Sequence, residues 1–583
     1  PSPETEAQVA TRMLPAALFR RPGMPGLLDW AKRAASLSRD SVDGDLKLQA
    51  SIAAGMYYFW VGDRVRTAIL VEDGRRLAAA ETRDPAVYLS WTWVEAMSSL
   101  CGGLDREAAR IALAGGLRAA RESGIRVWDH LLHGLSAIAS LMAGDAEAAA
   151  RSLKDMQPDA VPARRQACAM HEYLCSWLHL LRGDTARAAA HAERALGHAT
   201  ASGLVLSLVT CRLAIANIAI ERRRDSEAQT RVAEAWEIIR GVGSLPLEYM
   251  AHLTEARLLL ARGNEAEALA SLRAGLAIGR ERGYLNTFWW WQPIAMARLC
   301  EKALAAGIET DYVRGLIVAN DLAAEAPAVE LEEWPWPLRI YTLDRFGLIR
   351  RGESVLSPGK AQQKPLTMLK ALIAMGGRGV PESQLNDVLW PDVDGDLAHQ
   401  SFATTLRRLR QLLGSEKSIL MHDGRLTLNH RYCWVDVWAF ERLLGRAESG
   451  RPDASNGDGP VRLVERAMAL YRGPFLAGEN FFARVVSVRE RLRNKFLRAV
   501  EAAGRICEET GDLRRAIALY EKGLEVDGLT EEFYRCLISC YKKSGMNTEA
   551  LRVYRRCVNT LFSGLGVAPS RETEKLAKSL ITN

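Results

Sequence analysis

At 583 residues the chain is too long for one hydrophobic core and predicts several domains, and its 48% hydrophobic and 25% charged residues are typical of a globular protein. No apolar run reaches the roughly 18 residues of a membrane-spanning helix, so we expect no membrane partner and a cytoplasmic location. The net charge of +7 is uneven: residues 1–337 carry 38 Lys and Arg against 41 Asp and Glu, residues 338–583 carry 39 against 29, and a polyanionic partner is therefore expected on the C-terminal half.

Residues 1–323 are predicted to form an all-α sensor domain of repeats. An Ala-rich segment follows a turn signature that recurs every 39 to 41 residues, at Gly62-Asp63, Gly103-Leu104-Asp105, Gly144-Asp145, Gly183-Asp184, Arg224-Asp225 and Gly263-Asn264. The glycine ends one helix at a positive φ, and the Asp or Asn caps the next helix. Helix pairs at this period predict a tetratricopeptide-like α-solenoid whose units exceed the common length of about 34 residues.

The stretch "FWWWQP" places three tryptophans in a row, Trp289, Trp290 and Trp291. On a helix, adjacent residues cannot all face one core, so at least one of these rings is expected to be exposed. Two interpretations stay open. The rings form an aromatic patch for a ligand or partner in the concave face of the solenoid, or, as the simpler alternative, they pack between repeats.

Residues 324–337 are predicted to be a linker, with Trp334 and Trp336 docked against a neighbouring domain. A winged-helix domain is predicted over residues 338–434. Its signals are two or three short strands in 338–357, a hairpin in 418–429 that turns at Asp423-Gly424, and between them three helices at about 361–375, 381–389 and 396–413.

The third of these helices is amphipathic, with a core stripe of Phe402, Leu406, Leu409 and Leu413. No acidic residue lies between 397 and 413, whereas a solvated helix face normally mixes charges of both signs. Arg reads guanine, Gln reads adenine and Thr offers a hydroxyl and a methyl group. We therefore predict a DNA-recognition helix rather than a merely cationic surface helix, with base-facing residues Gln400, Thr404, Arg407, Arg408 and Gln411, and Ala403 allowing close approach.

Four further cations are candidates for phosphate contacts: Lys360, Lys364, His422 and Arg425. For each of them an ordinary solvated cation is the alternative. Residues 338–440 carry 14 basic and 10 acidic residues, a balance of only +4. A modest affinity of the monomer is therefore expected, improved by dimerisation or by a second contact.

A second polar break at 448–460 is interpreted as a loop, and a shorter repeat follows it, with Ala516 matching Ala550 and Tyr520 matching Tyr554 at an offset of 34. Residues 435–583 are thus predicted to be a second tetratricopeptide-like domain. The predicted fold class is mainly α: an α-solenoid, then an α/β winged helix, then a second α-helical repeat domain.

About 245 residues of the C-terminal half resemble the Streptomyces antibiotic regulatory proteins, and residues 435–583 resemble their bacterial transcriptional activator domain. The motifs are "GKAQQKPLTMLKALIAMGGRGVPESQLNDVLWPD", "ATTLRRLRQLLG", "VDVWAFERLL", "LYRGPFLAGE", "RERLRNKFLRAV", "AIALYEKGLEVDGLTEEFYRCLI" and "LFSGLGVAPSRETEKL". The resemblance implies a bacterial, nucleoid-associated activator that binds promoter direct repeats, forms homo-oligomers and recruits RNA polymerase. It also implies DNA contacts at Gln400, Thr404, Arg407 and Arg408. The wing reads "GRLTLN" where the family often has Gly-Tyr-x-Leu.

The N-terminal repeats resemble the sensor region of maltose-regulon-activator-type STAND proteins, in which a nucleotide-binding module usually accompanies the repeats. This chain has no GxxxxGK[ST] phosphate loop, and it opens with neither an initiator Met nor a signal-peptide pattern. Either such a module lies upstream of Pro1, or the protein has none.

No enzyme chemistry is predicted. The ten cysteines form no CxxC pair, "HEYLC" at 171–175 is not an HExxH zinc motif, and no Ser-His-Asp arrangement stands out. We expect no metal and no cofactor in this chain. The predicted function is a DNA-binding transcription regulator controlled by a signal ligand or partner on the N-terminal repeats. Two alternatives remain: a sensor-effector part of a STAND-type NTPase, and a repeat scaffold whose winged helix binds protein.

Overall fold

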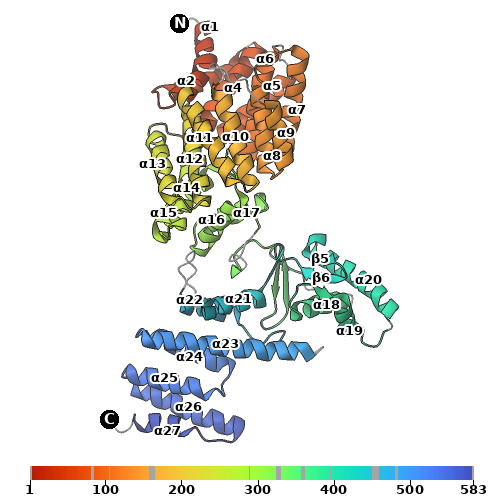
Figure 1. The fold of residues 1–583 in the computed structure, drawn as a ribbon, viewed down its shortest axis with the longest axis vertical. Helices are drawn as coiled ribbons and strands as arrows, with labels where there is room; N and C mark the ends of the chain where they lie inside the picture. Colours follow the sequence, from red (N-terminus) through yellow and green to blue (C-terminus); the bar gives the residue numbers. More distant parts are fainter. Residues whose placement is uncertain are drawn as a thin grey trace. The chain divides into compact units, whose positions relative to one another are not determined.

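The computed structural model consists of two compact units, residues 1–323 and 324–583 (Figure 1). The predicted fold class is confirmed: the first unit is an α-solenoid, and the second is a winged helix followed by helical repeats. Among the described residues, no helix is both long and apolar enough to cross a membrane. The structure describes residues 3–41, 43–80, 84–103, 105–156, 165–287, 289–323, 330–355, 362–393, 395–449, 459–479 and 483–580.

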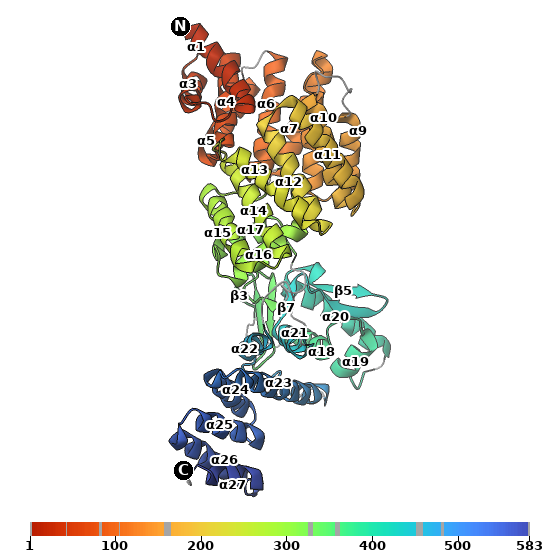
Figure 2. The same cartoon turned by 60° about the vertical axis from the view of Figure 1, so that its left-hand side comes forward.

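The first unit begins with short helices and continues as a series of helix pairs (Figures 1 and 2). The opening helices are α1 (Pro3–Gln8), α2 (Leu14–Arg20) and α3 (Leu27–Asp40). The pairs are α4 (Gly44–Trp60) with α5 (Arg64–Ala80), α6 (Pro85–Ser98) with α7 (Arg106–Ser123), α8 (Asp129–Met142) with α9 (Ala146–Met156), α10 (Arg165–Leu181) with α11 (Thr185–Ser202), α12 (Val205–Glu221) with α13 (Asp225–Ile239), α14 (Leu245–Ala261) with α15 (Glu265–Arg282), and α16 (Pro293–Ala305) with α17 (Thr310–Ala319).

The turns inside these pairs largely follow the predicted signature. Positive φ angles of 77° to 79° occur at Gly62, Gly144, Gly183 and Gly263. The capping carboxylate accepts a hydrogen bond from the N–H three residues ahead at Asp63, Asp105, Asp145 and Asp184. Two turns differ from the prediction: Arg223 rather than Arg224 takes the positive φ, of 55°, and Gly103 ends a π-helical segment.

The solenoid curls until its late repeats touch its early ones. The hydroxyl of Ser244, which precedes α14, donates a hydrogen bond of 2.9 Å to the carbonyl of Trp60 at the end of α4. The side-chain amide of Asn286, after α15, donates to the carbonyl of Leu100 over the same distance. Both polar side chains are buried, so the closure is part of the folded core of this unit.

The tryptophan segment corrects one prediction. Residues 284–287 and 289–292 are not helical, and Trp290 and Trp291 are buried, with 5% and 3% of their surface exposed. The hydroxyl of Tyr173 and the indole N–H of Trp177, both on α10, donate to the carbonyls of Trp289 and Trp291 at 3.1 Å. The three tryptophans therefore do not form one exposed patch, because Trp290 and Trp291 are buried and Trp289 alone is half-buried.

The second unit opens with the predicted strand and helix order. The strands are β1 (Leu338–Tyr341), β2 (Gly347–Arg350), β3 (Glu353–Ser354), β4 (Val380–Pro381), β5 (Ile419–His422), β6 (Arg425–Leu428) and β7 (Cys433–Val435). The helices are α18 (Gln363–Ala374), α19 (Glu382–Leu389) and α20 (Gly395–Leu413). All three helices predicted for this region are confirmed within about two residues of their expected ends.

Two small sheets frame these helices. One has the order β3-β2-β1-β7, in which β1 pairs with β7 in parallel and with β2 antiparallel. The other has the order β4-β6-β5 and contains the wing hairpin, in which His422 pairs with Arg425. The predicted turn is confirmed, since Asp423 and Gly424 adopt φ of 47° and 67°.

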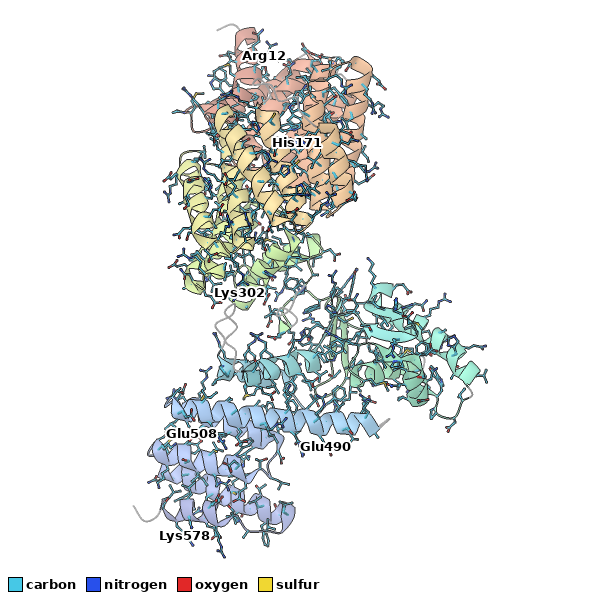
Figure 3. The ribbon with its side chains drawn as sticks, viewed as in Figure 1. Arg12, His171, Lys302, Glu490, Glu508 and Lys578 are labelled. Carbon is cyan, nitrogen blue, oxygen red and sulfur yellow. The ribbon has the colours of Figure 1, made fainter. Side chains whose placement is uncertain are left out.

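The helical repeats share one continuous hydrophobic core with the winged helix, from Leu338 to Leu561. Ala516 and Ala550, which the sequence places at equivalent repeat positions, are both fully buried. Figure 3 labels Glu490 and Glu508 on the longest of these helices, α23. The repeat helices are α21 (Asp436–Ser449), α22 (Pro460–Leu470), α23 (Ala483–Glu509), α24 (Leu513–Val526), α25 (Glu531–Lys543), α26 (Asn547–Leu565) and α27 (Arg571–Lys578).

One buried carboxylate ties the winged helix to this domain. Asp436 begins α21, is 2% exposed, and accepts hydrogen bonds from the backbone N–H groups of Thr342, Leu343 and Val437 and from the Thr342 hydroxyl, all at 2.7–2.8 Å. Burial raises the pKa of Asp436, and these donors oppose the shift because they favour the charged form. The end of β1 is thereby fixed to the start of α21.

The predicted docking of the linker tryptophans is confirmed. Trp334 and Trp336 are each 3% exposed, and the indole N–H of Trp336 donates to the carbonyl of Leu331 at 2.8 Å. Nearby, Glu330 forms an ion pair of 2.5 Å with Arg446 on α21. Residues 330–337 therefore pack on the second unit; residues 324–329, and residues 450–458 of the predicted loop, lie outside the described residues.

Candidate nucleic-acid interface

Helix α20 is held in place by the apolar stripe that the sequence predicts. Phe402, Leu406, Leu409 and Leu413 are between 0% and 5% exposed and belong to the core that contains α18 and the wing strands. Burial of four large apolar side chains at helical spacing fixes both the helix and its rotation about its axis. The opposite face of α20 is consequently directed away from the core.

That outward face is exposed along the described part of the helix. The exposed side chains are Gln400, Ala403, Thr404, Arg407, Arg408 and Gln411, which include all five residues predicted to face the bases. The hydroxyl of Thr404 donates to the carbonyl of Gln400 at 3.1 Å, so its oxygen still has acceptor capacity toward a ligand. The structure thus brings the five predicted base-facing residues together on one surface.

The arginines of α20 divide into two kinds. Arg410 is half-buried, pairs with Glu416 at 3.2 Å and donates to the carbonyl of Ile419 at 3.0 Å. Arg407 and Arg408 are exposed, and neither forms an ion pair or a side-chain hydrogen bond within the described part of the chain. Two guanidinium groups with unused donors therefore lie on the outward face, whereas the third arginine holds the helix to the wing.

Two acidic side chains beside this helix each face a basic side chain. Glu382, at the start of α19, lies 2.6 Å from a ring nitrogen of His399. Glu416, after α20, pairs with Arg410. His399, Ala403 and Arg407 border a shallow depression of about 220 Å³ beside the wing strand β5. His399 was not predicted as a site residue, although its spacing of four and eight residues from Ala403 and Arg407 places it on their side of the helix.

The candidate phosphate contacts are less open than the helix face. Arg425 is exposed, but its guanidinium donates to the carbonyl of Gly379 at 3.1 Å. A ring nitrogen of His422 lies 2.9 Å from the carboxylate of Asp423, and both side chains are more than four-fifths exposed. The wing tip therefore carries a histidine that faces an aspartate, beside one arginine that is already partly engaged.

At the start of α18 the lysine is drawn toward the protein. The ammonium group of Lys364 donates to the carbonyl of Leu389 at 2.5 Å and lies 5.7 Å from the ring centre of Trp390. An ammonium has three donors, so two remain available to a phosphate. Lys360 lies outside the described residues.

The described residues offer no site for a metal ion. No group of three or more His, Cys, Asp or Glu side chains in the described ranges is arranged to hold one. None of the ten cysteines, all of which lie in the described ranges, forms a disulfide, and eight of them are buried. Burial raises the pKa of thiols such as Cys101 and Cys175, each to about 12, which keeps them protonated and unreactive at neutral pH.

Comparison with known proteins shows which family the C-terminal quarter of the chain is similar to. A family model of the bacterial transcriptional activator domain matches residues 435–581. The regulatory protein AfsR of Streptomyces griseus is 26% identical over 232 residues, which cover 40% of this chain and 23% of that protein. AfsR of Streptomyces coelicolor is 27% identical over 246 residues, covering 41% and 24%. The chain thus spans about a quarter of the length of these relatives.

Among solved structures, Mycobacterium tuberculosis EmbR in complex with a low-affinity phosphopeptide matches 42% of this chain and 65% of that chain, with 22% identity and a TM-score of 0.33. The matches to the family model and to the two AfsR proteins rest on sequence. Residues 435–581 of the second unit are therefore similar to a bacterial transcriptional activator domain, and about 40% of the chain is similar to the AfsR regulators.

Proposed function

We propose that the protein is a sequence-specific, DNA-binding transcription activator, with α20 as the helix that enters the major groove. The observation that carries the proposal is the outward face of α20, on which Arg407 and Arg408 are exposed and without partners among the described residues. A guanidinium with free donors reads guanine by two hydrogen bonds, which a guanidinium already paired with a carboxylate does not.

The rest of the face fits the same role. Gln400 and Gln411 offer amide groups suited to adenine, and Ala403 leaves room for the helix backbone to approach the bases. The B-DNA major groove, about 12 Å wide, admits one α-helix. Lys364 and Arg425 remain the proposed phosphate contacts, with His422 a weaker one because it already faces Asp423.

The C-terminal repeats are proposed to assemble the protein with a second copy and with RNA polymerase. The name of the matching family, bacterial transcriptional activator domain, supports this role. Near the end of α26 a group of apolar side chains is 40% to 70% exposed: Leu529, Phe562, Leu565 and Val567. Exposed apolar side chains gathered in one place are typical of protein contacts. Phe562→Ser is expected to reduce self-association or activation while leaving DNA binding by the monomer unchanged.

The first unit is proposed to be the regulatory part, which detects a signal in a cytoplasmic, nucleoid-bound protein. Tetratricopeptide-like solenoids present extended concave surfaces, which other proteins of this architecture use for binding. The curled shape of this solenoid supports the proposal, since contacts such as Ser244 with Trp60 close the early repeats on the late ones. A ligand held between the two ends would change how firmly the unit closes.

The experiment that tests DNA binding starts from the intact chain. Fragments of sheared genomic DNA that the protein retains are sequenced, and the enriched fragment is then titrated in a mobility-shift assay at several salt concentrations. A steep salt dependence is expected, because each phosphate contact contributes about 0.9 to the slope of log affinity against log salt. Competitor DNA of unrelated sequence is expected to bind at least about a thousandfold more weakly.

The outcome that contradicts the proposal is equally definite. A protein that enriches no fragment and binds every DNA weakly has no recognition helix in α20. Stoichiometric recovery of a protein partner that contacts Arg407 would then favour a repeat scaffold whose winged helix binds protein. For substitutions of Arg407, the matched control position is Arg493 on α23, because it is exposed and forms no ion pair or hydrogen bond within the described ranges.

A further inference from the structure

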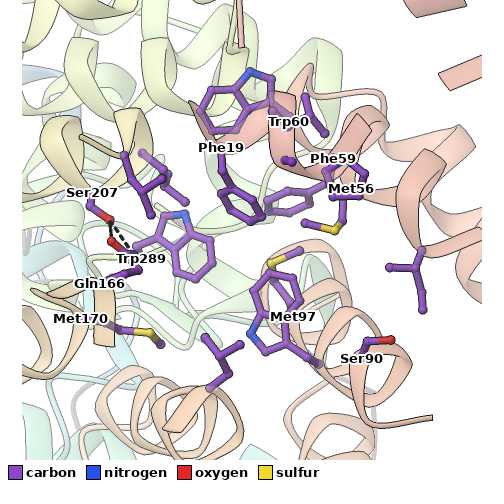
Figure 4. A pocket seen from close by; sticks show the side chains of 18 of the residues that line it. Phe19, Met56, Phe59, Trp60, Ser90, Met97, Gln166, Met170, Ser207 and Trp289 are labelled. Atoms are coloured by element: carbon purple, nitrogen blue, oxygen red, sulfur yellow. Dashed lines mark hydrogen bonds between the residues drawn. The ribbon is translucent and has the colours of Figure 1, made fainter. Parts of the chain in front are cut away.

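The inner side of the solenoid contains a large, partly open cavity within the first unit. Its volume is about 800 Å³, and its walls come from α2 and from the first helices of six successive pairs, α4 to α14, together with Trp289. This volume lies within the range of about 300–1,000 Å³ that pockets for drug-sized molecules occupy. Figure 4 shows the labelled side chains around one shared space.

The lining is rich in rings and thioethers. Aromatic side chains reach it from α2, α4, α6 and the segments before α8 and after α15, and three methionines lie among them: Phe19, Phe59, Trp60, Trp93, Trp128, Trp289, Met56, Met97 and Met170. Met side chains adapt to irregular partners, and aromatic rings prefer other rings in offset or edge-on contact. Trp289 is the member of the WWW sequence that points here, whereas Trp290 and Trp291 are buried.

The surface of the lining is mostly apolar, and its charged side chains are exposed to solvent. Gln166 and Ser207 exchange hydrogen bonds of 2.8 and 3.1 Å within the cavity wall (Figure 4). Arg12, Arg20 and Asp84 are exposed, and Arg20 donates to the carbonyl of Ser202 at 3.2 Å. The interior therefore offers hydrogen-bonding side chains, the half-buried imidazole of His130 among them, and no buried Asp, Glu, Lys or Arg, which selects against an ionised ligand.

We propose that this cavity binds a neutral, largely apolar organic molecule of drug size that carries at least one ring. Its polar atoms, such as a carbonyl or hydroxyl group, would meet Gln166 and Ser207, and its rings would lie among Trp289 and the phenylalanines. The claim that this molecule is the regulator's signal rests on the proposed function. Binding itself follows from the cavity alone.

A peptide fits the lining less well. An extended peptide brings an N–H and a carbonyl group with every residue, and each needs a partner once it leaves water. The lining supplies two side-chain amides, Gln49 and Gln166, and Gln166 is already engaged with Ser207. The other hydroxyl groups of the lining already donate to backbone carbonyls: Thr11, Ser90, Tyr173, Thr210 and Ser244. A molecule with few polar atoms matches this supply.

Occupancy would act on the closure of the solenoid. The walls join α2 and α4 at one end of the array to α12 and α14 near the other, so one bound molecule contacts repeats that are distant in sequence. A ligand that binds only the closed form stabilises that form. The regulatory signal would then be a change in how much of the protein is closed.

The test is a fluorescence titration of the intact protein with N-phenyl-1-naphthylamine, a neutral two-ring probe that brightens in apolar surroundings. The wild-type chain is expected to bind it saturably, with about one site per chain. Ser90→Trp places an indole in the cavity wall and is expected to weaken binding at least about tenfold. Ser123→Trp is the matched control, because both hydroxyls bond to a carbonyl of their own helix but Ser123 is exposed and outside the lining.

Charge is tested with 1-anilinonaphthalene-8-sulfonate, which has the same ring skeleton with a sulfonate added. Weaker binding of this anion than of the neutral probe supports a neutral ligand. Tighter binding would overturn the claim of neutrality and indicate that Arg12 and Arg20 bind the sulfonate. Three results would each overturn the proposal. The wild type could show no saturable binding of the neutral probe, or Ser90→Trp could bind it as tightly as the wild type. The probe could also be displaced by short apolar peptides but not by ring compounds. No DNA is present, so failure here leaves the test of Arg407 and Arg408 unaffected.

Discussion

Two arginine-rich helices of the second unit use their charges in opposite ways. Helix α20 contains "RRLR" at 407–410, and α23 contains "RERLR" at 489–493. On α23, the guanidinium of Arg489 donates to three backbone carbonyls between residues 475 and 479, and Arg491 pairs with Glu441. On α20, Arg407 and Arg408 have no such partner among the described residues.

The difference shows that composition alone does not reveal the purpose of a cationic helix. An arginine whose donors are already used inside the fold contributes to stability, and one whose donors face solvent is available to another molecule. The prediction for α20 depended on the absence of acids from its outward face, and α23 lacks that property because Glu490 lies within its arginine cluster. The two kinds of arginine are best distinguished by measuring both folding stability and DNA affinity on the same variant.

The largest effect on stability is expected at the buried carboxylate between the two domains of this unit. Asp436→Ala leaves the N–H groups of Thr342, Leu343 and Val437 without their acceptor. Each buried unsatisfied donor costs about 1–3 kcal/mol, so unfolding should become easier by about 3 kcal/mol or more. Urea denaturation of the intact protein measures it, and a change below about 0.5 kcal/mol would mean that water replaces the carboxylate.

Removal of an arginine on α23 should come next. Arg489→Ala deprives the carbonyls of residues 475, 476 and 479 of a charged donor and is expected to cost about 2–3 kcal/mol of folding free energy. Arg493→Ala, on the same helix but exposed, is the control and should stay within about 0.5 kcal/mol. Neither variant should alter DNA affinity once the measured affinity is corrected for the fraction of protein that is folded. A loss of affinity in Arg489→Ala after this correction would mean that α23 contacts DNA.

A smaller effect, on DNA alone, is expected from the amide at the start of the outward face. Gln400→Ala removes an exposed side chain that forms no hydrogen bond within the described ranges. The hydroxyl of Thr404 donates to the backbone carbonyl of residue 400, which the substitution leaves in place. Loss of one base contact should cost about 1–3 kcal/mol, near the lower end here, and should relax the preference at a single base pair. Titration against a panel of single-base variants of the operator measures it; a uniform loss across the panel would make Gln400 a backbone contact.

The smallest effect is expected at the wing. Arg425 already donates to the carbonyl of Gly379, so Arg425→Ala should weaken binding by less than about 1 kcal/mol and equally for all sequences. The slope of log affinity against log salt should fall by about 0.9 if it neutralises one phosphate. An unchanged slope would mean that Arg425 only stabilises the wing and contacts no phosphate.

Much of the second unit could be predicted because its signals are local. The stripe of Phe402, Leu406, Leu409 and Leu413 fixes the rotation of α20 through helical spacing alone, and Asp423-Gly424 specifies its own turn. The exposure of the five predicted base-facing residues followed from the same spacing. Their role at DNA remains a prediction.

What the sequence missed depends on contacts between distant residues. Asp436 reads as an ordinary helix-start acid, yet its donors lie 93 and 94 residues earlier. Trp289, Trp290 and Trp291 were placed on a helix, but Tyr173 and Trp177, more than 110 residues earlier, hold this segment in a non-helical form. Within "RRLR", the ion pair with Glu416 and the hydrogen bond to the carbonyl of Ile419 distinguish Arg410 from its neighbours. Pairings of this kind have no local signal.

The most direct test of the central claim is the double variant Arg407→Ala/Arg408→Ala, measured for unfolding by urea and for affinity to the selected genomic fragment at one salt concentration. The free energy of unfolding should change by less than about 0.5 kcal/mol, because both side chains lack partners among the described residues. Affinity should fall by about 2 kcal/mol or more, roughly thirtyfold. A folded double variant that binds the fragment as tightly as the wild type would contradict the assignment of α20 as the recognition helix.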